Sequence, residues 1–173
     1  MLARSAYARE LEHSDDPLAE LPRDTDERYL SRQVVVVGHG RVGRPLVKAL
    51  RDAHVPLVVA ERQREQVEAL REQSVAAVSG DAAEPEVLIQ AHIARAGLLI
   101  ITPRDLVAAQ SALETARTLN PGIHVMVLAA NDEEAQRLRA QGADVCLSAE
   151  EAQAEALARR VLQHVHGGGG PTS

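Results

Sequence analysis

Aromatic side chains are nearly absent from this 173-residue chain, which has no phenylalanine or tryptophan and only two tyrosines. Both of them, Tyr7 and Tyr29, precede the first long apolar run. The core must therefore be built from valine, leucine, isoleucine and alanine. A bound nucleotide base would have to lie on aliphatic side chains or on an arginine plane rather than on an aromatic ring.

Cysteine and long apolar runs are scarce as well. The single cysteine, Cys146, excludes an internal disulfide and favours a reducing compartment. It lies in an apolar run, so we expect its side chain to be buried and to pack in the core rather than to act as a reactive thiol. No run approaches the ~18 apolar residues that a membrane span needs, and the first residues lack the apolar core of a signal peptide. A net charge of −6 argues against a nucleic-acid partner. We expect a soluble, cytoplasmic chain.

Short apolar runs alternate with amphipathic stretches of helical periodicity through most of the chain. The runs cover residues 33–37, 56–60, 75–78, 98–101, 124–128 and 144–147. This alternation predicts an α/β fold, a Rossmann-like doubly wound parallel sheet of six strands with helices on both faces. In the six-stranded dinucleotide-binding order, ligands bind at the carboxyl ends of the first and fourth strands, where the strand order reverses.

The two ends of the chain differ from its middle. Residues 1–30 combine charged stretches with prolines, which predicts a linker or N-terminal arm with a short polar helix over 4–12. Residues 31–166 form the predicted domain. The glycine-rich residues 167–173 predict a flexible tail.

A glycine-rich turn follows the first apolar run directly. Gly38, Gly40 and Gly43 have the spacing G-x-G-x-x-G between a predicted strand and a predicted helix. In that motif the first glycine permits the tight turn, the second admits a pyrophosphate, and the third lets the helix pack on the strand. The free N–H groups at the helix start favour an anion. The residues predicted to bind the ligand here are Gly38, His39, Gly40, Arg41, Val42 and Gly43.

Two of these turn residues leave alternatives open. Arg41 can reach a phosphate oxygen as a charged donor, or it can be a solvated arginine. His39 lies within the motif, but a solvent-facing histidine is the favoured interpretation of its side chain.

Glu61 ends the second apolar run, roughly 20 residues after the first glycine of the turn, where a dinucleotide site has an acidic residue for the ribose hydroxyls. Its charge would repel a 2′-phosphate, which favours NAD or AMP over NADP. Arg62 is expected to flank the adenosine. The alternative is that Glu61 is an ordinary surface charge.

Further candidates follow the third and fourth apolar runs. Asp81, within Gly80-Asp81-Ala82, can accept a hydrogen bond from an adenine amino group. It can also cap the next helix, since its spacing to Glu84 fits a capping box. Thr102 can contact the ribose or a phosphate. Gly80, Asp81, Ala82 and Thr102 complete the predicted cofactor-binding set.

Catalytic and metal-binding motifs are missing. The glycine spacing also fits a P-loop, but Arg44 and Pro45 stand where its lysine and hydroxyl residue belong. The only lysine, Lys48, is near neither tyrosine, which excludes a short-chain dehydrogenase pair. The seven histidines form no metal-ligand group. We therefore expect no catalytic residue and no metal. The alternative is a small NAD-dependent oxidoreductase with its site at a dimer interface.

The chain resembles the RCK-N (TrkA-N) domains, which are nucleotide-binding regulators of potassium channels and transporters. The matching stretches are residues 34–43, Glu61, 80–82, 85–88 and 98–102. A Gly-x-Gly-Arg-x-Gly turn combined with Gly-Asp-Ala one strand further on is more specific than the glycine spacing alone.

Within that family the chain is most similar to the cytosolic C-terminal domains of YbaL/Kef-type monovalent cation:proton antiporters, through residues 16–22 and 86–93. The resemblance implies AMP or NAD/NADH as ligand, a homodimer of domains, and control of cation efflux. It also implies a membrane antiporter domain upstream in the same polypeptide, with this domain on the cytoplasmic side of an inner membrane.

The chain departs from the Kef pattern in one segment. Glutathione-gated Kef proteins carry an arginine-rich segment after the fifth strand, whereas residues 128–132 contain no arginine, so glutathione gating is not expected.

The predicted helix at 105–119 and the last helix have small apolar faces suited to dimer contacts. Nucleotide binding to one arrangement of the dimer would shift the equilibrium of the attached transporter.

Overall fold

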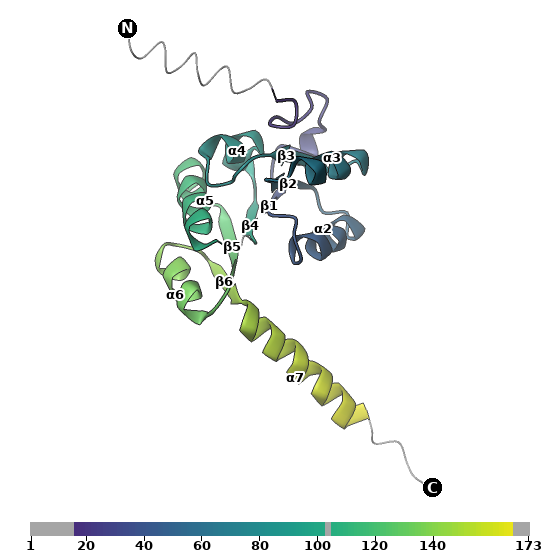
Figure 1. The fold of residues 1–173 in the computed structure, drawn as a ribbon, viewed down its shortest axis with the longest axis vertical. Coiled ribbons are helices and arrows are strands. Elements are labelled where there is room, and N and C mark those ends of the chain that lie inside the picture. Colours follow the sequence, from purple (N-terminus) through teal and green to yellow (C-terminus); the bar gives the residue numbers. More distant parts are fainter. Residues whose placement is uncertain (1–15, 103–104, 168–173) are drawn as a thin grey trace.

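The structure, a computed structural model, describes residues 16–102 and 105–167 (Figure 1). The polar helix predicted over 4–12 and the last six residues of the predicted tail lie outside these ranges. Within them, no helix is long and apolar enough to cross a membrane.

Six strands form one parallel sheet in the order β3-β2-β1-β4-β5-β6, which confirms the predicted fold class (Figure 1). The strands are β1 (Val34–Val37), β2 (Leu57–Glu61), β3 (Ala76–Ser79), β4 (Leu98–Ile101), β5 (His124–Ala129) and β6 (Val145–Ser148). The order reverses between β1 and β4, which pair from Val34 with Leu98 to Val37 with Ile101. Their carboxyl ends therefore lie level, at the place where such sheets bind ligands.

Helices cover both faces of the sheet. They are α2 (Gly43–Asp52), α3 (Arg64–Glu72), α4 (Pro85–Gln90), α5 (Leu106–Leu119), α6 (Asp132–Ala140) and α7 (Ala149–Gly167). Alternate side chains of β1 point to opposite faces, since Val34 and Val36 pack with α2 and α3 whereas Val35 and Val37 pack with α4, α5 and α6. Two short 3-10 helices, η1 (Glu27–Tyr29) and η2 (Ile93–Arg95), were not predicted.

Helix α7 differs from the others because it buries no residue and extends away from the sheet (Figure 1). Its exposed apolar side chains are Leu157, Val161, Leu162 and Val165. The sheet also keeps apolar surface on its α2 side, where Leu147 of β6 is 53% exposed and Met126 and Leu128 of β5 are half-buried. Apolar surface is thus left exposed both on α7 and on the β5–β6 end of the sheet.

Candidate functional site

The glycine turn between β1 and α2 needs glycine at two of its three positions. Gly38 has a φ of +95°, and a Cβ there would lie 2.6 Å from the hydroxyl oxygen of Thr102. A Cβ on Gly43 would overlap the carbonyl oxygen of Gly38. A Cβ on Gly40 would meet nothing within 4 Å. The turn is therefore closely packed at both ends and open in its middle, as the motif predicts for the approach of a ligand.

Thr102, at the end of β4, lies directly beneath this turn. Its hydroxyl donates to the carbonyl of Val37 at 2.7 Å, and its backbone N–H donates to the same oxygen at 3.0 Å. The hydroxyl hydrogen is thereby used within the protein. Only the lone pairs of this oxygen remain for the ligand contact that the sequence predicts.

Glu61 ties the glycine turn to the turn that follows β2. Its Oε2 accepts from the backbone N–H of His39 at 2.7 Å, and its Oε1 accepts from that of Gln63 at 2.9 Å. Glu61 is only 9% exposed, so the alternative of an ordinary surface charge is wrong. Each carboxylate oxygen keeps a second lone pair, which can accept a hydrogen bond from a ribose hydroxyl.

His39 is half-buried rather than solvent-facing. Its Nδ1 is fully covered and has no hydrogen-bond partner among residues 16–102 and 105–167. Burial lowers the pKa of the imidazole, the positive charge of Arg44 lowers it further, and Glu61 opposes both. The imidazole of His39 is therefore neutral at neutral pH. Arg44 also holds the backbone of this turn, because its Nε donates a hydrogen bond to the His39 carbonyl at 3.2 Å.

Asp81 closes the turn after β3 instead of capping α4. Its Oδ1 accepts from the N–H of Ala83 at 2.9 Å, and its Oδ2 lies 3.8 Å from Nε of Arg62. The N-cap residue of α4 is Glu84, and no side chain caps this helix. The predicted capping box is wrong because Asp81 lies too far before the helix and bonds within its own turn. The predicted contact of Asp81 with an adenine remains a prediction.

These turns line an open cavity of about 770 Å³ at the carboxyl end of the sheet. The predicted site residues all line it: Gly38, His39, Gly40, Arg41, Val42, Gly43, Glu61, Arg62, Gly80, Asp81, Ala82 and Thr102. The volume lies within the usual range for ligand sites of roughly 300–1,000 Å³. Backbone N–H groups and arginines suit an anion, and the partly buried carboxylate suits hydroxyl groups.

A family model confirms what these residues indicate. The model described as "TrkA-N domain" matches residues 34–149, which is more than half of the chain. The chain belongs to the TrkA-N family. The crystal structure of the TrkA-N domain of the inner membrane protein YbaL from Escherichia coli is 34% identical, with a TM-score of 0.72 over 75% of this chain and 96% of that one.

Longer relatives contain this TrkA-N domain as one part. The putative cation/proton antiporter YbaL of Escherichia coli (strain K12) is 33% identical over 153 residues, which cover 88% of this chain and 26% of that protein. This chain therefore spans about a quarter of that curated relative's length.

Two solved structures with a bound nucleotide share the fold. The Kef C-terminal domain of Shewanella denitrificans in its AMP-bound form has a TM-score of 0.66 and 21% identity, over 77% of this chain and 80% of that one. The GsuK channel bound to NAD has a TM-score of 0.65 and 22% identity, over 82% of this chain and 25% of that one.

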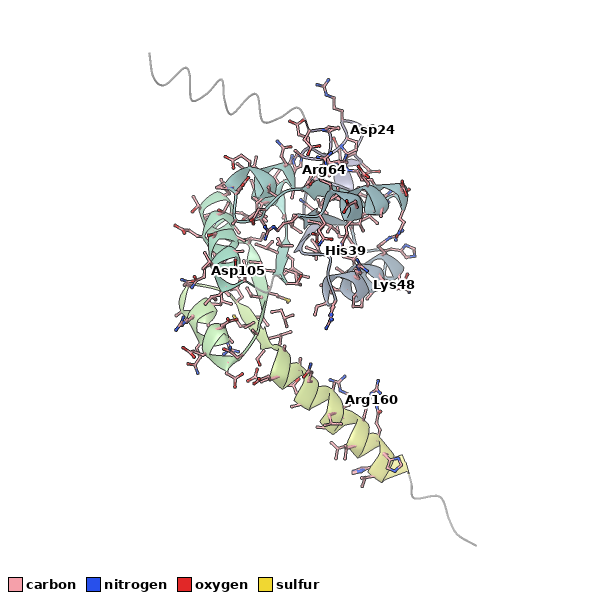
Figure 2. The ribbon with its side chains drawn as sticks, viewed as in Figure 1. Asp24, His39, Lys48, Arg64, Asp105 and Arg160 are labelled. Carbon is pink, nitrogen blue, oxygen red and sulfur yellow. The ribbon has the colours of Figure 1, made fainter. Side chains whose placement is uncertain are left out.

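The cavity of this TrkA-N domain has a second half that the sequence analysis missed. Its lining residues there are Asp105, Ala108, Leu128, Ala129, Ala130, Ala149 and Gln153. They lie at the end of β5 or directly after it, or at the starts of α5 and α7. Figure 2 labels Asp105, the N-cap residue of α5, and His39 of the glycine turn. The rule that ligands lie beyond the carboxyl ends of the strands predicts the positions after β5. Gln153 carries no comparable signal, because only the path of α7 brings it to the cavity.

Metal ligands are not grouped in the part of the chain that the structure describes, where no three histidine, cysteine, aspartate or glutamate side chains converge. Cys146 is buried, and burial raises the pKa of its thiol, which agrees with the packing role predicted for it.

Proposed function

We propose that this TrkA-N domain senses a nucleotide, AMP or NAD/NADH, and thereby regulates a potassium or other monovalent cation:proton antiporter to which it is joined. The observation that supports it best is Glu61, whose buried carboxylate holds the glycine turn through His39 and still has lone pairs facing the cavity. A ribose bound there would place its phosphates over Gly40, the open position of the turn. AMP in the Kef domain and NAD in GsuK support the same ligand class.

Titration calorimetry on the chain with AMP, NAD, NADH and NADP tests this proposal. AMP, NAD and NADH are expected to bind, and NADP more weakly, because Glu61 repels a 2′-phosphate. If none of the four binds, the proposal is wrong. Turnover of a bound cofactor with a metabolite would favour an oxidoreductase instead.

The affinity for NAD is expected to rise as the pH falls, because His39 gains a proton on binding. The imidazole is neutral in the free protein, since its pKa is lowered by burial and by Arg44. A nearby phosphate favours the charged imidazolium and raises this pKa in the complex, so protons and nucleotide bind together. The rise runs from the raised pKa of the complex down to the lowered pKa of the free protein, which lies below about 6.5, and is at most about tenfold per pH unit. His39→Gln should remove the dependence, whereas an equal slope in this variant contradicts the assignment.

We further propose that two copies pair through α7. Its four exposed apolar side chains and the half-exposed apolar surface of β5 and β6 would then cover each other across the dimer. The chain should sediment as a dimer, and Val161→Glu should shift it to monomer because a charge would be buried in that interface. Gln163→Glu adds the same charge at a polar position of α7 and should leave the dimer intact. A wild-type monomer at high concentration contradicts the pairing.

Regulation would follow because nucleotide binding and the arrangement of the two paired copies are thermodynamically linked. Gln153 and Ala149 of α7 line the nucleotide cavity, while Val161 lies two to three turns further along the same helix. A nucleotide that binds one position of α7 more tightly favours one arrangement of the pair. The attached membrane domain would respond to that arrangement.

A further inference from the structure

Residues 16–21, which we call the clasp, lie across the free edge of β3, the outermost strand on its side of the sheet. Leu18 is buried with the side chains on the α2 side of the sheet, and Leu21 packs against the core on the other side. The carbonyl of Leu18 accepts a hydrogen bond from the N–H of Ser79 at 2.7 Å. The clasp therefore straddles the edge strand, although its proline and its charges predict a linker.

One arginine holds most of the clasp. Arg71 of α3 donates from Nη1 to the carbonyl of Pro17 at 3.0 Å, and from Nη2 to those of Leu18 at 3.4 Å and Glu20 at 2.6 Å. Its Nε donates to the carbonyl of Ala77 in β3 at 2.9 Å. A single guanidinium, with five donors in a rigid fork, thus joins three clasp carbonyls to the edge strand.

The clasp also contacts the residues next to two turns that line one end of the cavity. On the β2 side, Arg64 is the first residue of α3, lies three residues after Glu61, and forms an ion pair with Asp16 of the clasp. Figure 2 labels Arg64. On the β3 side, Ser79 bonds to the clasp and is followed directly by Gly80 and then by Asp81 of the cavity wall. The clasp therefore bonds to residues that flank two turns of the cavity wall, one after β2 and one after β3.

We propose that docking of the clasp is coupled to nucleotide binding, so that the clasp passes the state of the cavity to the polypeptide that precedes Asp16. This rests on the proposed function. A ligand that holds the turns at Glu61 and Asp81 in one arrangement also holds Arg64 and Ser79, which carry the clasp. Coupling is reciprocal, so a docked clasp raises nucleotide affinity by the factor by which nucleotide favours docking. A clasp that merely covers an edge strand has no such effect.

Hydrogen exchange followed by mass spectrometry on the 173-residue chain tests the coupling, with AMP and NAD as probes. Saturating nucleotide is expected to slow exchange in residues 16–21 by about fivefold or more, along with the glycine turn. Protection of the glycine turn without any change in the clasp overturns the coupling and leaves the proposed function intact. No protection anywhere overturns both.

Variants give the reciprocal measurement. Arg71→Gln frees three clasp carbonyls and should weaken AMP binding by about fivefold or more. Arg64→Gln breaks only the surface pair with Asp16, so it keeps the test available if the first variant does not fold, and its affinity should fall in the same direction. Arg51→Gln is the matched control, because Arg51 bonds to Gln73 between α2 and α3, outside the cavity and the clasp. Unchanged AMP affinity in the folded clasp variants overturns the proposal.

Discussion

Gly40→Asp is expected to abolish nucleotide binding while leaving the fold intact. A Cβ at Gly40 meets no atom within 4 Å, so the protein has room for a side chain to begin there. The space it would fill is the cavity above the turn, where a ligand phosphate would lie. Two negative charges in contact cost several kcal/mol, so affinity for AMP or NAD should fall roughly a hundredfold or more.

The matched control for this variant is Gly122→Asp. Gly122 also has open space at its Cβ and lies outside the cavity, so it accepts the same charge without touching the ligand. Calorimetry with AMP should give wild-type affinity for Gly122→Asp, and both variants should unfold in urea at the wild-type midpoint. Wild-type AMP affinity in Gly40→Asp would remove the cavity from consideration as the nucleotide site.

The sheet could be predicted because each strand is determined by residues that are neighbours in the sequence. Buried parallel strands appear as short apolar runs, and the strand order follows from the glycine turn and the alternation with helices. The element ends moved by a residue or so. Strand β2 begins at Leu57 rather than at residue 56, and β3 ends at Ser79 rather than at residue 78, because pairing between strands and turn contacts decides where an element begins and stops.

The cavity could be predicted only on one side. Its glycine, acidic and Gly-Asp-Ala residues belong to motifs whose chemistry restricts the residue type, so their positions can be recognised along the chain. The opposite wall uses Ala108, Ala130 and Gln153, which side-chain type does not distinguish from packing residues. Tertiary structure alone brings these positions to the ligand side.

The clasp shows why a linker is difficult to tell from an edge element. Its polarity and Pro17 predict irregular backbone, which is what the structure contains. The clasp is attached by Arg71 of α3, which lies about 50 residues further along the chain. In the sequence, nothing distinguishes Arg71 from the other charged residues of an amphipathic helix. Contacts made by backbone carbonyls leave no trace in the side-chain pattern, so sequence reasoning has no means to predict them.

Gly43→Ala is expected to damage the fold itself. A Cβ at this position overlaps the carbonyl oxygen of Gly38, and backbone cannot rotate aside as a side chain can. Either α2 must move away from β1 or the turn must open, and both moves disturb the Glu61–His39 bond. Overpacking of this kind lowers the free energy of unfolding by about 1–3 kcal/mol, which urea unfolding measures as a lower midpoint at unchanged slope.

Gly40→Ala is the control, since it adds the same methyl group to the same turn where the space is open. It should unfold at or slightly above the wild-type midpoint, because alanine restricts the unfolded chain more than glycine does. Equal stability of Gly43→Ala and Gly40→Ala would contradict the close packing of α2 on β1. The expected difference follows from one principle, that a glycine is required where another backbone occupies the position of its missing Cβ, and Gly43 is such a position whereas Gly40 is not.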